Sequence, residues 1–249
     1  MKCALAVFVL LSASLATAAV PGAKVLGVDV DAHKGTATIH LLNASGKDIS
    51  AYVLSFDAAY ANGHTDHTEI LVDLLPLMMT MVEQAPGSSL NNGSFRAAEA
   101  RDEVENLPTG TGNPLTRAEA AVIVAVYVDR TVDAQSDAAL ERVVALRRGI
   151  ALARSESADV IYKATTSRGQ AHPSAVAADG VREILLRRKT DHTGESVTEL
   201  LSIVDDMVRA PAEAAELGLG ERDYLTGYAT KATARGSTAL AQAQIRREP

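Results

Sequence analysis

The stretch ANGHTDHTEI, residues 61–70, holds the side chains whose types and spacing could do chemistry. His64 and His67 flank an acidic residue, Glu69 follows two positions later, and Asp57 precedes them all. Imidazole and carboxylate groups are suitable ligands for zinc or manganese. Asp57, His64, His67 and Glu69 are therefore candidate metal ligands. A metal-binding protein or a metal-dependent hydrolase is one hypothesis for the function.

The residues around this stretch predict a β-hairpin. Apolar and polar residues alternate through AYVLSFDAAY and stop at Asn62-Gly63, a strong turn signal. A two-residue turn would place Glu69 opposite Phe56, beside the core. A shift by one residue turns every side chain to the other face, so we predict a three-residue loop, Asn62–His64. That loop pairs Phe56 with Ile70, Leu54 with Val72 and Tyr52 with Leu74.

The predicted register places the candidate ligands on a solvated face. His67, Glu69 and Asp73 would point outward, Asp57 would lie opposite Glu69, and His64 would sit in the turn. A structural zinc site needs four convergent ligands and a supporting second shell, which an exposed strand face does not supply. An ordinary polar sheet face is the competing interpretation, and on it no cofactor is expected.

The flanking segments extend the β pattern over residues 19–132. KVLGVDVDA and GTATIHLL alternate, a further strand is predicted over Leu77–Val82, and a short one near Phe95. The continuous apolar run EAAVIVAVYVDRTV indicates a central strand buried on both faces. Strands linked by tight turns without intervening helices favour an antiparallel, immunoglobulin-like β-sandwich.

The apolar period changes to 3.6 over residues 133–249, which predicts a mainly α-helical region. The fold class is therefore α+β, an N-terminal sandwich followed by helices. Ser136 or Asp137 can cap the first helix, and the fourth follows Gly220. The expected apolar stripes are Leu140, Val143, Val144, Leu146 and Ile150 in the first helix, Val176, Val181, Ile184, Leu185 and Leu186 in the second, and Val197, Leu200, Leu201, Val204 and Val208 in the third.

The N-terminus has the pattern of a secretory signal peptide over residues 1–18. Lys2 precedes an apolar run that ends at Ala16-Thr17-Ala18, a small-x-small cleavage pattern. The run is shorter than the about 20 residues that a membrane-spanning helix needs. We expect an exported protein, periplasmic or secreted, with no membrane span in the mature chain. The single cysteine, Cys3, would leave with the peptide.

Charge divides unevenly along the chain. Residues 19–129 carry 6 Lys/Arg against 14 Asp/Glu, whereas residues 130–249 carry 17 of each. The acidic first part should repel nucleic acid, so no nucleic-acid partner is expected. Arg147-Arg148 and Arg187-Arg188-Lys189 could form a partner-binding patch or could be neutralised by nearby acids. The apolar helical stripes could contact another envelope protein.

The run LLNASGKDISAYVLSFDAAYANG resembles the core hairpin of small extracellular bacterial β-sandwich modules, the FxLYD-like and other immunoglobulin-like kinds. An Asn-x-Ser-Gly-Lys turn, alternating aromatic residues and a Tyr-x-x-Gly turn carry the resemblance. It is also similar to secreted proteins that join such a module to a helical tail. The resemblance implies a non-catalytic module. Together with the lack of P-loop, Gly-x-Ser-x-Gly and His-Glu-x-x-His motifs, it favours a non-enzymatic binding or scaffold role.

Overall fold

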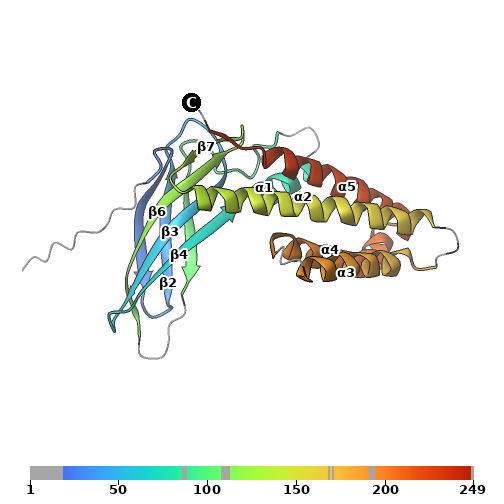
Figure 1. Ribbon diagram of the computed structural model, residues 1–249, viewed down its shortest axis with the longest axis horizontal. Coiled ribbons are helices and arrows are strands. Elements are labelled where there is room, and N and C mark those ends of the chain that lie inside the picture. The colour runs from blue at the N-terminus through green and yellow to red at the C-terminus, as the bar shows by residue number, and fades with distance from the viewer. Residues whose placement is uncertain are drawn as a thin grey trace, which may run out of the picture.

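The computed structural model describes residues 19–85, 89–107, 113–167, 169, 171–190 and 194–247; of residues 189, 190, 194 and 195 it describes the backbone alone. The sheets come first in the chain and the helices dominate its second half, so the predicted α+β class is confirmed (Figure 1). The predicted signal peptide, residues 1–18, lies outside the described residues.

Two sheets face each other. A three-stranded sheet has the order β1-β2-β5, and a five-stranded sheet has the order β4-β3-β6-β7-β8. All strand pairs are antiparallel except β7–β8, which is parallel. The strands are β1 Ala23–Asp31, β2 Thr36–Asn43, β3 Ile49–Tyr60, β4 Thr65–Asp73, β5 Ala100–Asn106, β6 Leu115–Tyr127, β7 Thr131–Ala134 and β8 Arg246–Arg247.

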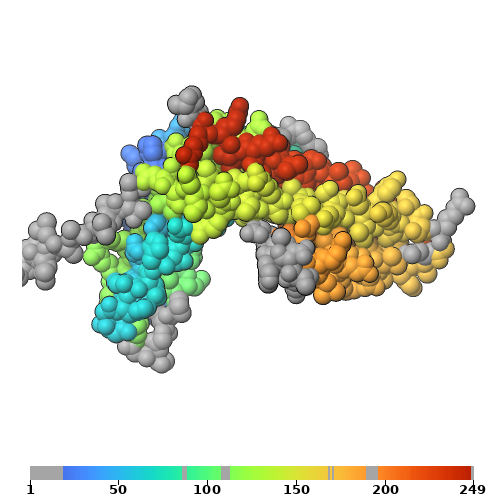
Figure 2. Space-filling view, viewed as in Figure 1, coloured from blue at the N-terminus to red at the C-terminus, as the bar shows by residue number. Residues whose placement is uncertain are grey.

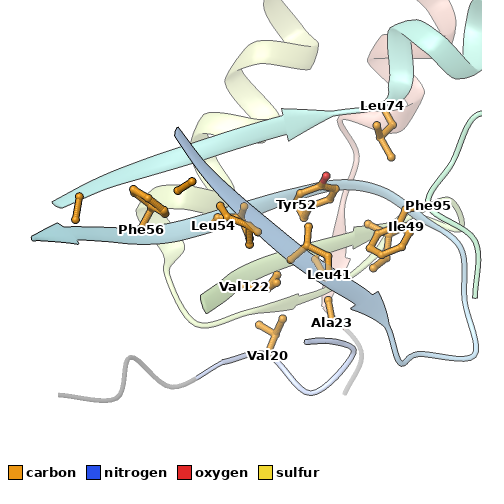
Figure 3. Packing of buried hydrophobic residues seen from close by; sticks show 14 of the residues in the cluster. Val20, Ala23, Leu41, Ile49, Tyr52, Leu54, Phe56, Leu74, Phe95 and Val122 are labelled. Carbon is orange, nitrogen blue, oxygen red and sulfur yellow. The ribbon is translucent and has the colours of Figure 1, made fainter. Parts of the chain in front are cut away.

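The main core lies between the two sheets. Tyr52, Leu54 and Phe56 alternate along β3 on the side of the sheet that faces Leu41 of β2 (Figure 3). Ile39 of β2 belongs to the same buried cluster. All five are at most 1% exposed, because successive strand residues face opposite sides and this set faces inward. The alternation that predicted the strand therefore also identified its buried face.

The strand β6 is central and buried on both faces, as its continuous apolar run predicted. Val122 packs into the core between the sheets, whereas Val124 faces the other way and packs against Val143 of the helix α2. The outer face of the five-stranded sheet is therefore covered by a helix along part of its length. This contact joins the sheets to the helical half.

The segment after β4 is a helix, so the predicted strand over Leu77–Val82 is wrong. The helix α1 spans Leu75–Gln84 and has Pro76 in its first turn, where proline is tolerated. Asp73 Oδ1 accepts the Leu75 N–H at 3.0 Å and so satisfies a donor at the helix start. The unbranched methionines of LPLMMTMVEQ favour a helix as well.

Four long helices form the second half. Ser136 Oγ accepts the Ala139 N–H at 3.1 Å, so Ser136 caps α2, and Asp137, the other predicted cap, is its first helical residue. The helix α5 lies along α2, and the antiparallel pair α3–α4 packs against α2 from below (Figure 1). These helices are α2 Asp137–Thr166, α3 Pro173–Thr190, α4 Gly194–Glu216 and α5 Glu221–Gln242.

The segment after α5 returns to the five-stranded sheet. Arg246 N donates to Arg130 O at 2.8 Å, and the two residues of β8 pair with β7. Ile245 packs against the apolar cluster between α2 and the sheet. A sheet assigned from the sequence to residues 19–132 therefore gains a strand from the other end of the chain. The boundary between residues 132 and 133 itself stays a prediction.

Candidate functional site

The β3–β4 hairpin positions all four candidate metal ligands, in a register that differs from the predicted one. The loop is Ala61–Gly63, closed by Tyr60 N–H donating to His64 O at 2.9 Å. Gly63 takes a left-handed φ of +84°, which suits the last residue of a three-residue hairpin loop. The predicted pairs are wrong: Ile70 lies opposite Leu54, Val72 opposite Tyr52, and Thr68 opposite Phe56.

This correction is a shift of two residues, so each side chain keeps its predicted face. It changes the neighbours: Asp57 lies opposite His67 and not opposite Glu69. His67 Nδ1 is 2.8 Å from Asp57 Oδ1, and His64 Nε2 is 2.7 Å from Asp66 Oδ1. Glu69 accepts a hydrogen bond from Arg142 of α2. The four candidates are thus divided among three pairs.

These pairs lie apart from one another on the hairpin and do not converge on one point. Among the residues that the structure describes, no three His, Cys, Asp or Glu side chains gather as metal ligands. A depression of about 300 Å³ beside Asp57 is lined by Ala59, Thr65, Arg117 and Glu119. Arg117 donates to Glu119 within it. The two charges compensate each other, so this face offers exposed polar contacts but no assembled catalytic group.

Asp73, predicted to point into solvent, is buried with Arg147. Arg147 Nε and Nη2 donate to the two carboxylate oxygens of Asp73 at 3.1 and 3.0 Å. The same guanidinium donates to Gln242 O at 3.0 Å and to Ser50 Oγ at 3.1 Å. Arg147 is 0% exposed, so it is no part of a surface basic patch. It joins the sheet, α2 and α5 at one point.

A second cluster, made of His40, Asp29 and Asp102, lies on the outer face of the three-stranded sheet. It was not predicted from the sequence. His40 Nδ1 is 2.7 Å from Asp102 Oδ1, and His40 Nε2 is 3.1 Å from Asp29 Oδ2. The hydrogen bonds to Asp102 and then to Asp29 raise the pKa of His40 above its ordinary value of 6.5. The alternation of β1, β2 and β5 brings the three residues to one face, but β5 was not predicted from its sequence.

The raised pKa of His40 makes a small part of the stability depend on pH. Its contribution is fully present below the unfolded pKa and is lost as the pH rises through the folded pKa. We expect His40→Asn to lower the melting temperature at about pH 5.5 and to have a smaller effect at about pH 8.5. Thermal unfolding followed by circular dichroism measures both. His33→Asn, in the β1–β2 turn, is the control. An effect of His40→Asn that does not change with pH would contradict this reading.

The surface of α3 and α4 exposes several large apolar side chains. α4 buries Leu200, Ile203 and Met207 against its neighbours. The predicted stripe also included Leu201 and Val208, but these are 45% and 60% exposed. The apolar arc of α4 is therefore wider than the part that the rest of the chain covers.

The exposed side of α4 adjoins an exposed side of α3. Leu186, expected in a buried stripe, is 66% exposed there. Between the helices a groove of about 330 Å³ has Met207 and Ala178 among its lining residues, with Val208 and Pro211 beside them. We give the name α3–α4 face to one set of exposed residues on these helices, namely Ala175, Asp179, Arg182, Leu186, Leu201, Asp205, Val208, Pro211 and Ala212.

Polar contacts inside the bundle fix the helices that carry this face. Arg154 of α2 donates to Glu199 of α4 and, at 3.2 Å, to the Tyr228 hydroxyl of α5. Tyr228 in turn donates to Asp206 at 2.6 Å. Burial, with Asp206 as a further cause, raises the pKa of Tyr228, so its hydroxyl remains a donor at neutral pH. Three helices are thus joined through one partly buried network.

None of the described helices is long and apolar enough to cross a lipid bilayer. Comparison with protein-family models gave no match, and comparison with curated proteins gave none. Among solved structures, the chain is similar to a hypothetical protein from Peptoclostridium difficile 630 at 11% identity and a TM-score of 0.29. That match covers 46% of this chain and 87% of the other. The resemblance to FxLYD-like modules stays a prediction.

Proposed function

We propose that this chain is an exported, non-enzymatic binding protein whose helical half engages another protein through the α3–α4 face. The carrying observation is the exposure of Leu186, Leu201 and Val208 on one side of two packed helices. Contiguous apolar patches on soluble proteins mark interaction sites more often than scattered single residues do. Export is proposed from the signal-peptide pattern of residues 1–18.

The chemistry of the face favours a protein partner with apolar side chains. Covering apolar surface gains about 25 cal/mol per Å², so three half-exposed side chains and a groove supply a usable driving force. Val208 and Pro211 line the groove as well and are exposed, so they add apolar surface that a partner can cover.

The rest of the fold supports this role by holding the helices rigidly. Arg235 of α5 donates to Glu83 of α1 in a bidentate pair, and Arg147 fixes α2 to the sheet. The side-chain hydrogen bond from Arg235 holds the pKa of Glu83 below its usual value, so the pair stays charged at neutral pH. The helices therefore form an arm at a set angle to the sheets (Figure 1).

Site-specific photocrosslinking tests the proposal. A photoreactive apolar residue at Val208 should yield crosslinked species in producing cells, and peptide mapping should place the crosslink in an apolar helical segment. Leu201→Glu in the same chain should abolish it. Leu240 of α5, which is 52% exposed outside the face, is the control position. The proposal fails if Val208 and Leu240 give the same products.

A further inference from the structure

We infer that the protein docked on the α3–α4 face is a second copy of this chain, related by a two-fold axis perpendicular to α3 and α4. The inference rests on the proposed function and names its partner. A two-fold interface must be self-complementary, because each residue that contacts a second one is contacted by that residue's symmetry mate. One stripe of exposed residues on each helix meets this condition.

Four exposed residues of α3 are symmetric about its middle. Ala175, Asp179, Arg182 and Leu186 are spaced by four, three and four residues, which keeps them on one face of a helix. An axis between residues 180 and 181 places Asp179 opposite Arg182 of the other copy, so acid meets base twice. The same axis places Ala175 opposite Leu186, so a small residue meets a large one twice.

The exposed residues of α4 have the same symmetry. An axis between residues 204 and 205 places Leu201 opposite Val208 of the other copy, and the reverse contact follows by symmetry. Leu201 and Val208 are seven residues apart, which is two helical turns, so they lie on one line of the helix surface. Each apolar residue on this line therefore meets another.

One axis can serve both helices because their midpoints lie side by side. α3 and α4 are antiparallel and pack together, and Ala178 shares the groove with Met207. Antiparallel helices advance in opposite directions, so the position two to three residues beyond Ala178 lies beside the position two to three residues before Met207. These are the positions 180–181 and 204–205. The midpoint of the α3 stripe and the midpoint of the α4 stripe therefore lie side by side in the monomer, so both can lie on one two-fold axis.

Charge and size also favour a second copy. Asp179 and Arg182 form an ion pair at 2.6 Å within one chain, which makes the middle of the α3 surface neutral in a chain of net charge −7. The 18 residues of α3 give a face about 27 Å long, and two adjacent helices make it about 20 Å wide. That footprint is about 540 Å² per partner, at the small end of specific interfaces, where association is weak and depends on concentration.

Sedimentation equilibrium of the purified chain tests the association. We expect a concentration-dependent monomer–dimer equilibrium. Leu201→Glu should raise the dissociation constant at least about 100-fold, since two carboxylates are buried per dimer. Leu240→Glu, at a comparable exposed position on α5, should leave the constant unchanged. Circular dichroism checks that both variants fold.

Disulfide trapping tests the geometry. With Cys3 replaced by serine, the double variant Ala175→Cys/Leu186→Cys should form covalent dimers on mild oxidation. The two positions are 11 residues apart on one helix, about 16 Å, so they cannot bridge within one chain. Ala175→Cys/Leu240→Cys should remain monomeric on a non-reducing gel.

The outcomes separate this inference from the proposed function. A chain that sediments as a monomer at every concentration, or traps no more dimer than the control pair, overturns the homodimer. If Val208 then crosslinks to an apolar helix of a different protein, the proposed function stands with another partner. If Val208 crosslinks to neither, both fail.

Discussion

Replacing Arg147 by methionine is expected to lower the free energy of unfolding by about 3–5 kcal/mol, because it leaves the Asp73 carboxylate buried without its charge partner. The arginine also donates to Ser50 Oγ and Gln242 O, so three separate elements lose a contact at once. Urea unfolding followed by circular dichroism measures the change. Methionine keeps most of the side-chain volume, so a cavity contributes little.

The neighbouring arginine gives a matched control. Arg148 is exposed on the same helix, and Arg148→Met should change the stability by less than about 0.5 kcal/mol. Adding Asp73→Leu to Arg147→Met should recover part of the loss, since an apolar pair leaves no buried charge. Recovery remains partial because Asp73 also accepts the Leu75 N–H at the start of α1. Equal losses from Arg147→Met and Arg148→Met would show that the buried pair has no special role.

Replacing Asn43 by alanine is expected to cost about 2–4 kcal/mol, because four hydrogen bonds converge on one buried amide. Asn43 is 0% exposed, and its Nδ2 donates to Lys47 O at 2.9 Å and to Phe95 O at 2.8 Å. Its Oδ1 accepts from Ser45 N and Ser45 Oγ at 3.0 and 2.6 Å. The side chain therefore shapes the turn between β2 and β3 and attaches the segment at Phe95 to it.

Asn92 provides the comparison for this effect. It is partly exposed and lies in a loop, and its replacement can be measured in the same urea titration. Asn92→Ala should lose less than about 0.5 kcal/mol. A loss at Asn43 no larger than at Asn92 would mean that the turn holds its shape without the amide.

Local patterns predicted the parts of the fold that local physics determines. The alternation along β3 identified its buried face, and Ser136 identified the start of α2, because both depend on neighbours within a few residues. The apolar run after Asp73 fits a strand or a helix equally well by periodicity. There the helix is favoured by Pro76 in the first turn and by the Asp73 side chain, which accepts the Leu75 N–H.

The site depends on partners that are distant in sequence, and that part could not be predicted. Asp73 was expected in solvent, since its partner Arg147 lies 74 residues further on. β5 was missed because ARDEVEN has the charged composition of an exposed segment; only its pairing with β2 makes it an edge strand. The extent of the α3–α4 face was missed as well. A sequence stripe shows that α4 is amphipathic, but only the packing shows which half of the stripe is covered.

The closing of the five-stranded sheet by β8 sets an order on folding. Arg147 donates to Gln242 O, which lies 95 residues later in the chain. Asp137 accepts a hydrogen bond from Arg247, which lies 110 residues later. A ribosome releases the N-terminal end first, so Arg147 Nη1 lacks its Gln242 acceptor and the edge of β7 stays unpaired until synthesis is nearly finished. Contacts of such long sequence separation also form slowly. Under the export that we propose, both delays would keep the chain unfolded while it is translocated.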